Sequence, residues 1–363
     1  MAAALKDRYT RAYVTRLATV LARHDKTFDA EAFVAAVLGR GWQSLELKAR
    51  MRRIATCLHA HLAGDYRAQI AALKQAAPEF HGGDNGFLAM FFPDFVEVYG
   101  LEDFDTSMAA LEWFTRFSSS EFAVRPFIVR YGARALTVFH RWARSENEHV
   151  RRLASEGLRP RLPWAMALPQ FKRDPAPLLP LLTSLLDDPS AYVRRSVANH
   201  LNDIVKDHPE RVLALARTHL GRSVAIDALL KHACRTLLRR GEPGALALFG
   251  HDHDSGATVA ALKLGARRLA IGGDLAFSFE VVAAAAARLR IEYAVDFVKA
   301  RGHRTRKVFK VAERTLAAGA RLRYARSHRF RDLSTRTHYP GLHRIAIVVN
   351  GRELAAAEVR LVK

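Results

Sequence analysis

The chain has 363 residues, of which half are hydrophobic, enough for two domains and at least one sizeable core. It contains no run of eighteen apolar residues and does not begin with the long apolar stretch of a secretory signal, so we expect no membrane span and a cytoplasmic protein. Lysine and arginine number 57 against 36 acids, a net charge of +21.

The positive charge is concentrated toward the C-terminus. Residues 261–363 carry 22 basic and 8 acidic side chains, which leaves 35 and 28 in residues 1–260. Such a field attracts polyanions, of which nucleic acid is the commonest. Charge for solubility and an anionic membrane surface are the competing interpretations. The two cysteines, Cys57 and Cys234, lie in helix-like segments and are predicted to be buried, reduced thiols.

Residues 1–250 are predicted to be helical, because apolar residues recur at three- and four-residue spacing in segments such as YVTRLATVLARH and AEAFVAAVL. A repeat is visible in Val124-Arg125, Val150-Arg151 and Val193-Arg194, each opening an amphipathic helix after a polar stretch. The last two are 43 residues apart, within the ~40–47 range of HEAT repeats, whereas the first gap is only 26. The pattern predicts a solenoid of helix pairs with a concave face, and a structural role for the second and third arginines.

The segment 150–164, VRRLASEGLRPRLPW, interrupts this pattern. Its two prolines end the helix, and Trp164 follows Pro163 beside Arg159 and Arg161. A tryptophan in a loop between arginines suits base stacking or a cation–π contact, although packing in a core is the commoner use of tryptophan. The other three tryptophans lie in apolar helical patterns and are predicted to pack.

Three acids lie in or beside the Val-Arg helices: Glu121, Glu156 and Asp203. Counted from the repeat valine, Glu156 is at +6 and Asp203 at +10, so at about 100° per residue they point within roughly 40° of each other. Both are predicted to face one groove of the solenoid. Glu121 is at −3, roughly opposite, and its position after three serines makes a helix cap the alternative. For any one acid alone, a solvated or capping role competes.

Beyond residue 260 the periodicity changes. In RLRIEYAVDFV the apolar residues alternate from Leu289 to Phe297, which predicts a half-buried strand, and Asn350-Gly351 predicts a hairpin turn. About seven short strands in about a hundred residues favour an immunoglobulin-like β-sandwich, without the Cys…Trp…Cys signature. The stretch HDHDSGAT, 251–258, is predicted to be a hinge, and its HDHD is only a weak metal signal. We therefore predict an all-α HEAT-like solenoid domain, 1–258, and a basic β-sandwich domain, 263–363.

The segments SSSEFAVRPF, SEGLRPRLPW and SVANHLNDIVKDHP resemble AlkC-type DNA alkylation repair glycosylases, and the resemblance covers most of residues 1–250. Family members occur with or without an immunoglobulin-like C-terminal domain, and residues 263–363 are similar to that addition. The resemblance implies a monofunctional DNA glycosylase that excises cationic alkylpurines, chiefly 3-methyladenine, from double-stranded DNA. It also implies excision without an ordinary base-flipping pocket, a metal or an organic cofactor, and we expect a monomer.

The resemblance further implies the site residues. The family acids match Glu121, Glu156 and Asp203, and the family aromatic matches Trp164. A carboxylate stabilises an oxocarbenium-like sugar or positions water, and an aromatic face favours a cationic base. Phosphate contacts are predicted for a set of cations, namely Arg152, Arg159, Arg161 and Arg195 in the helical part and Arg304, Arg306 and Lys307 in the sandwich. The sandwich is expected to clamp the DNA backbone. The competing hypothesis is a nonenzymatic HEAT scaffold that binds nucleic acid or protein.

Overall fold

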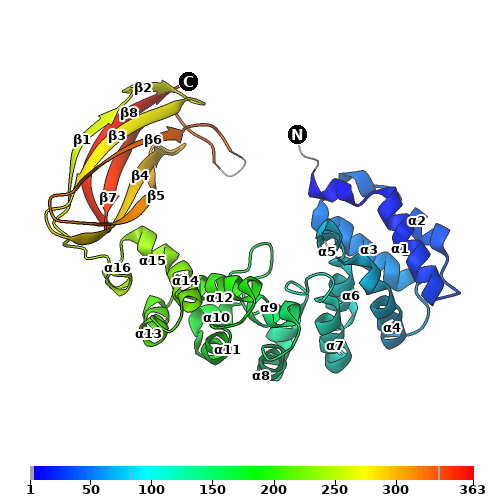
Figure 1. Cartoon of the computed structure of the whole chain (residues 1–363). Helices are drawn as coiled ribbons and strands as arrows, with labels where there is room; N and C mark the ends of the chain where they lie inside the picture. Colours follow the sequence, from blue (N-terminus) through cyan, green and yellow to red (C-terminus); the bar gives the residue numbers. More distant parts are fainter. Residues whose placement is uncertain (1–3, 82, 334–335) are drawn as a thin grey trace. The chain divides into compact units, whose positions relative to one another are not determined.

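The computed structural model describes residues 4–81, 83–333 and 336–363. Helices occupy the chain up to Leu248 and strands occupy it from Thr258 (Figure 1), which confirms the predicted fold class of a helical solenoid followed by a β-sandwich. The chain forms two compact units, residues up to 208 with 221–229, and residues 209–220 with 230–363. The second unit therefore joins the last helices to the strands, and a division into 1–258 and 263–363 stays a prediction.

The helices of the first unit pack in succession: α1 on α2 and α4, α3 on α6, α6 on α7, α7 on α8, and α8 and α12 on α9 (Figure 1). They are α1 (Arg11–His24), α2 (Ala30–Val37), α3 (Leu47–His61), α4 (Tyr66–Ala76), α5 (Gly83–Leu88), α6 (Phe91–Tyr99), α7 (Phe104–Phe114), α8 (Val124–Trp142), α9 (Glu148–Glu156), α10 (Pro169–Arg173), α11 (Leu179–Ser184) and α12 (Ala191–Ile204). Helix α14 (Val224–Ala233) contributes residues to both units.

The predicted repeat is visible in the backbone contacts of its arginines. The Arg151 guanidinium donates to the carbonyls of Ser145 and Glu146, and Arg194 donates to those of Asp188 and Pro189, in each case six and five residues earlier. Both arginines thus fix the turn before their helix, which confirms their structural role. Arg125 instead reaches three carbonyls of the segment after α9.

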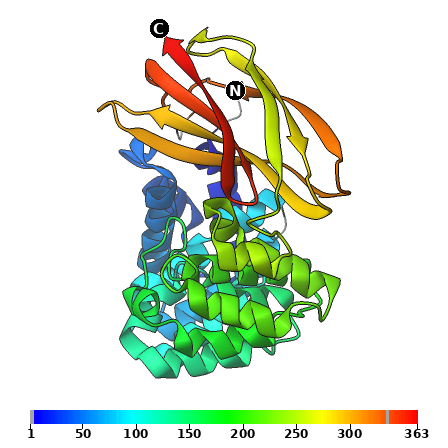
Figure 2. The same ribbon diagram turned by 90° about the vertical axis from the view of Figure 1, so that its left-hand side faces the viewer.

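The second unit contains three further helices and two sheets, seen from a second direction in Figure 2. Its helices are α13 (Pro209–His219), α15 (Arg235–Arg240) and α16 (Pro243–Leu248). Its strands are β1 (Thr258–Leu264), β2 (Arg268–Ala270), β3 (Asp274–Val282), β4 (Ala287–Val298), β5 (Arg304–Leu316), β6 (Arg321–Arg329), β7 (Gly341–Val349) and β8 (Arg352–Val362). One sheet has the order β1-β3-β6 and the other β2-β8-β7-β4-β5, and the described pairings are antiparallel except β2 with β8.

The sandwich core contains the residues predicted for β4: Leu289, Ile291, Tyr293, Val295 and Phe297 are all buried in it. The prediction that the opposite face of β4 is exposed is wrong for Arg290 and Glu292. Arg290 and Glu292 are buried there and bond each other at 2.5 Å, because Glu313 and Lys231 of α14 cover them in a continuous ion-pair chain.

The hairpin turn between β7 and β8 is confirmed, with positive φ at both Asn350 and Gly351. This turn is packed rather than free. The Asn350 amide donates to the carbonyls of Asp252 and Arg288 and accepts from the Arg290 N–H, and a Cβ on Gly351 would lie 2.8 Å from Gly241 Cα. Residues 251–254, predicted as part of a hinge, are thus bonded to the hairpin. Among the described helices, none has the length and apolarity needed to cross a bilayer.

Candidate functional site

The last residues of α9, up to Glu156, are buried. Asn147 caps the helix by accepting from the N–H groups of His149 and Val150, and the helix ends at Glu156. Gly157 follows because the chain passes close to α8: an added Cβ would lie 2.8 Å from the Val124 side chain. The Glu156 side chain, directly before this close approach, is buried.

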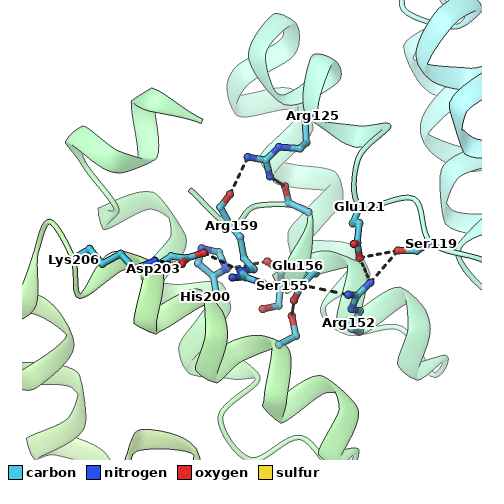
Figure 3. Close-up of polar contacts among 12 residues, drawn as sticks. Ser119, Glu121, Arg125, Arg152, Ser155, Glu156, Arg159, His200, Asp203 and Lys206 are labelled. Carbon is cyan, nitrogen blue, oxygen red and sulfur yellow. Dashed lines mark hydrogen bonds and ion pairs between the residues drawn. The ribbon is translucent and has the colours of Figure 1, made fainter. Parts of the chain in front are cut away.

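The Glu156 carboxylate is held from several sides (Figure 3). One oxygen accepts from Arg159 Nη1 at 2.6 Å and the other from Ser196 Oγ at 2.6 Å, while Arg152 approaches to 3.6 Å. With donors on both oxygens, this buried carboxylate keeps one orientation.

Asp203 reaches the same cluster through Arg159, whose Nε donates to it at 2.9 Å (Figure 3). The other oxygen of Asp203 accepts from Lys206 at 3.0 Å. Arg159 therefore joins Glu156 and Asp203 in one ion-pair cluster, and that both acids face one groove stays a prediction. Burial lowers the pKa of the Arg159 guanidinium, but the two carboxylates outweigh that effect and leave the pKa raised.

Glu121 joins the cluster through Arg152, which ion-pairs with it and also approaches Glu156. The prediction that Glu121 points away is wrong, because the residue precedes α8 and does not follow that helix's angular spacing. It does not cap α8 either; its carboxylate accepts from Ser119 Oγ at 2.8 Å and from Arg152. The five side chains Glu121, Arg152, Glu156, Arg159 and Asp203 form one chain of alternating charge, here called the acid–arginine chain.

The acid–arginine chain borders an open cavity of about 650 Å³, a size within the ~300–1,000 Å³ range of ligand pockets. Its walls are His81, Gly86, Phe87, Met90, Arg116, Phe117, Ser118, Ser119, Glu121, Phe122, His149, Arg152, Glu156, Arg159, Leu162, Pro163, Trp164 and Tyr192. Glu121 and Glu156 line it, whereas Asp203 lies behind Arg159. Carboxylates beside aromatic faces favour a planar, positively charged group.

Trp164 lies in the loop after α9, with 67 % of its surface exposed and φ at 64°. A left-handed conformation costs a non-glycine residue roughly 1–2 kcal/mol and persists only where its surroundings fix it. The carbonyls of this loop are held by Arg125 and Lys48. Burial, followed by the charge of Arg159, lowers the pKa of Arg125 to about 10, so that it remains a cation at neutral pH.

His200 lies under the acid–arginine chain, fully buried, with Nδ1 donating to the Ser155 carbonyl at 2.9 Å. Its Nε2 has no partner among the described residues. Burial, followed by the charge of Arg159, lowers the pKa of His200 to about 3. Since the unfolded chain binds this proton below about pH 6.5, folding stability contributed by the neutral ring is present above that pH and is lost as the pH falls toward 3.

We therefore expect His200→Asn, whose amide can keep the bond to Ser155, to flatten the pH dependence of stability. Between pH 7 and pH 5 the parent should lose about 2 kcal/mol more of its free energy of unfolding than the variant does. Urea titrations at the two pH values measure this difference, with the exposed His24→Asn as control. An equal loss in parent and variant would show that His200 does not remain neutral in the folded state.

The predicted phosphate-binding cations lie in different settings. Arg152 and Arg159 are occupied by the acids, and Arg161 ion-pairs with Asp207 at 2.6 Å. Arg195 is exposed. Arg161 and Arg195 are therefore more exposed to solvent than Arg152 and Arg159, the two arginines of the acid–arginine chain.

In the sandwich, Arg304 pairs with Glu358 at 3.2 Å and Arg306 with Glu353 at 2.7 Å. Lys307 is exposed, and desolvation with the charges of Arg336 and Arg239 lowers its pKa. Of these three cations, Arg304 and Arg306 are thus paired with acids, whereas Lys307 has no ion-pair partner among the described residues.

Sequence reasoning missed several residues that shape the site. Ser196 and His200 were not predicted, although with the predicted Asp203 they have i, i+4, i+7 spacing on α12 and form one polar face toward α9 and its following loop. Arg125 and Lys48 were missed because they act on backbone carbonyls 32 to 116 residues away, for which no local pattern exists.

Comparison with known proteins agrees with this architecture. Residues 105–237 match a family model described as DNA alkylation repair enzyme, and residues 258–363 match the C-terminal Ig-like domain of uncharacterised protein YhaZ. The YhaZ protein of Bacillus subtilis (strain 168) is 42% identical over 347 residues, 96% of each chain. The alkylpurine DNA glycosylase AlkC of Pseudomonas fluorescens, solved bound to DNA containing an abasic site analog, is 38% identical with a TM-score of 0.95, over 99% of this chain and 100% of that one.

Helices followed by an immunoglobulin-like sandwich, in the order of these two family models, define a DNA alkylation repair protein with a C-terminal Ig-like domain. The chain belongs to the AlkC-type family of DNA alkylation repair glycosylases that carry a C-terminal immunoglobulin-like domain.

Proposed function

We propose that the protein is a monofunctional DNA glycosylase that hydrolyses the N-glycosidic bond of cationic alkylpurines, chiefly 3-methyladenine. The observation that carries the proposal is the acid–arginine chain, which presents Glu121 and Glu156 to a cavity beside the exposed ring of Trp164. The likeness to the Pseudomonas fluorescens alkylpurine glycosylase supports the same reaction.

The chemistry requires little general-acid help, because an N3-alkylated adenine already carries a positive charge and leaves as a neutral base. The sugar becomes oxocarbenium-like as the bond breaks. A carboxylate fixed by its own hydrogen bonds stabilises that charge without reorganisation and positions the attacking water. Glu156 and Glu121 border the space where the sugar would lie, and Asp203 holds Arg159 and through it Glu156.

Trp164 is proposed to contact the lesion or its neighbouring base, because an aromatic face favours a cationic base over its neutral parent. Arg152 and Arg159 are proposed to fix the acids, a role that the structure favours over phosphate binding. Arg161 and Arg195, with Arg304, Arg306 and Lys307 of the sandwich, are proposed phosphate contacts on double-stranded DNA. We further propose a monomer that acts on the nucleoid in the cytoplasm without a metal or organic cofactor.

The purified protein is expected to release free 3-methyladenine from methylated double-stranded DNA, measured by chromatography of the supernatant. Release should be much slower for neutral alkylated bases, which lack the charge that the carboxylates and Trp164 recognise. Heat-denatured protein serves as the blank. Tight DNA binding with no release of any alkylated base would instead favour a nonenzymatic HEAT scaffold.

A further inference from the structure

The loop that carries Trp164 is held by its backbone from two sides. Arg125 of α8 donates to the Arg159 carbonyl at 3.0 Å (Figure 3). It also donates to the carbonyls of Gly157 and Met166 at 2.9 and 2.6 Å. Lys48 of α3 donates to the carbonyl of Trp164 itself. Between them the two cations engage the start, the middle and the end of the loop.

Lys48 occupies an unusual position for an exposed lysine. Its ammonium lies 4.4 Å from the centroid of the Phe122 ring, and Phe122 separates the cavity from a smaller hollow lined by Lys48. Within the described residues no carboxylate lies at ion-pair distance from it, so its contacts are a carbonyl oxygen and an aromatic face. The residue therefore connects α3 to the loop across 116 positions of sequence.

We propose that Lys48 and Arg125 are positioning residues for the base-excision reaction, a role that rests on the proposed function. The bond to the carbonyl of Trp164 fixes the peptide plane that follows it, and this plane together with the left-handed φ sets the direction of the Cα–Cβ bond from which the indole extends. Lys48 holds that plane, and Arg125 holds the loop ends from which it extends. The indole is thus oriented toward the cavity before DNA binds.

The decisive variant is Lys48→Met, which keeps the stem of an exposed side chain and removes its donor. We expect kcat for base release to fall roughly tenfold to hundredfold, with DNA affinity and its salt dependence unchanged. Acrylamide quenching of tryptophan fluorescence should also change, since Trp164 is exposed whereas Trp42 and Trp142 are buried. Lys48→Arg, which retains a donor, should recover most of the activity.

The matched control is Lys74→Met, which removes a lysine 5.6 Å from the centroid of the Trp113 ring and should leave kcat unchanged. If Lys48 is instead a phosphate ligand, Lys48→Met will weaken DNA binding, reduce the salt slope by about one and leave quenching unchanged, and the proposal fails. Unchanged kcat and quenching would overturn it too.

A second variant, Arg125→Lys, keeps the charge but loses the planar fork that reaches three carbonyls. If it folds by circular dichroism, the same fall in kcat at unchanged affinity is expected; if it does not fold, Lys48→Met decides alone. The quenching readout needs no catalysis, so a parent protein that releases no base would defeat the proposed function while the loop proposal is still tested.

Discussion

Replacing Glu156 with glutamine, or Asp203 with asparagine, is expected to abolish base release while DNA binding persists. Each amide has nearly the size of the carboxylate but removes the negative charge that stabilises the sugar, or that fixes Arg159. Loss of one preorganised electrostatic partner typically costs 10²–10³ in kcat, so release should fall at least that far. Single-turnover release of 3-methyladenine measures the rate, and fluorescence anisotropy with labelled DNA measures the affinity.

Two neighbours supply the controls. Glu148 lies on the exposed start of α9, and Asp207 follows α12 in an exposed pair with Arg161. Glu148→Gln and Asp207→Asn remove the same charges from the same elements and should keep the parent rate. If Asp203→Asn releases base at the parent rate, the catalytic assignment of Asp203 is wrong. If Glu156→Gln does so, Glu156 is not the carboxylate that stabilises the sugar, and the proposed mechanism is wrong.

Replacing Arg159 with methionine is expected to destabilise the fold by about 3–5 kcal/mol. The substitution leaves the buried carboxylates of Glu156 and Asp203 without the cation that lies between them, and an uncompensated buried charge carries a penalty of that order. Lys206, Ser196 and Arg152 still contact the acids, which keeps the expected loss within this range. Urea denaturation followed by circular dichroism gives the free energy of unfolding.

Arg161→Met is the matched comparison, two residues further along the same loop. Its ion pair with Asp207 is partly solvated, and such a pair contributes about 0–1 kcal/mol. A similar loss of unfolding free energy in the two variants would mean that Arg159 does not compensate the buried charges of the acid–arginine chain.

In the sandwich, the features that depend on neighbouring residues could be predicted from the sequence, and those that depend on distant residues could not. The alternation along β4 and the Asn350-Gly351 turn were predictable because both depend on neighbouring residues alone. The burial of Arg290 and Glu292 was not, because the cover comes from Lys231 on a helix some 60 residues earlier. The described residues form eight strands where about seven short ones were predicted, and several are long, β5 having 13 residues.

The site was predictable to a similar extent. Helical angles predicted similar directions for Glu156 and Asp203. The two acids do lie in one cluster, because both belong to regular helices that pack on each other. The same rule failed for Glu121, which lies before α8, and its place in the cluster came only from the family resemblance. The two arginines that connect the acids were assigned to phosphate, since nothing in a sequence tells a buried arginine from an exposed one.

The packed turn at Asn350 and Gly351 has a practical consequence for dissecting the protein. A hairpin tip is ordinarily a safe place for an inserted tag, and a boundary near residue 258 is a natural place to cut, but here both operations would remove contacts with the stretch from Gly241 to Asp254. A fragment meant to carry the sandwich should therefore begin near residue 230, where the second unit resumes.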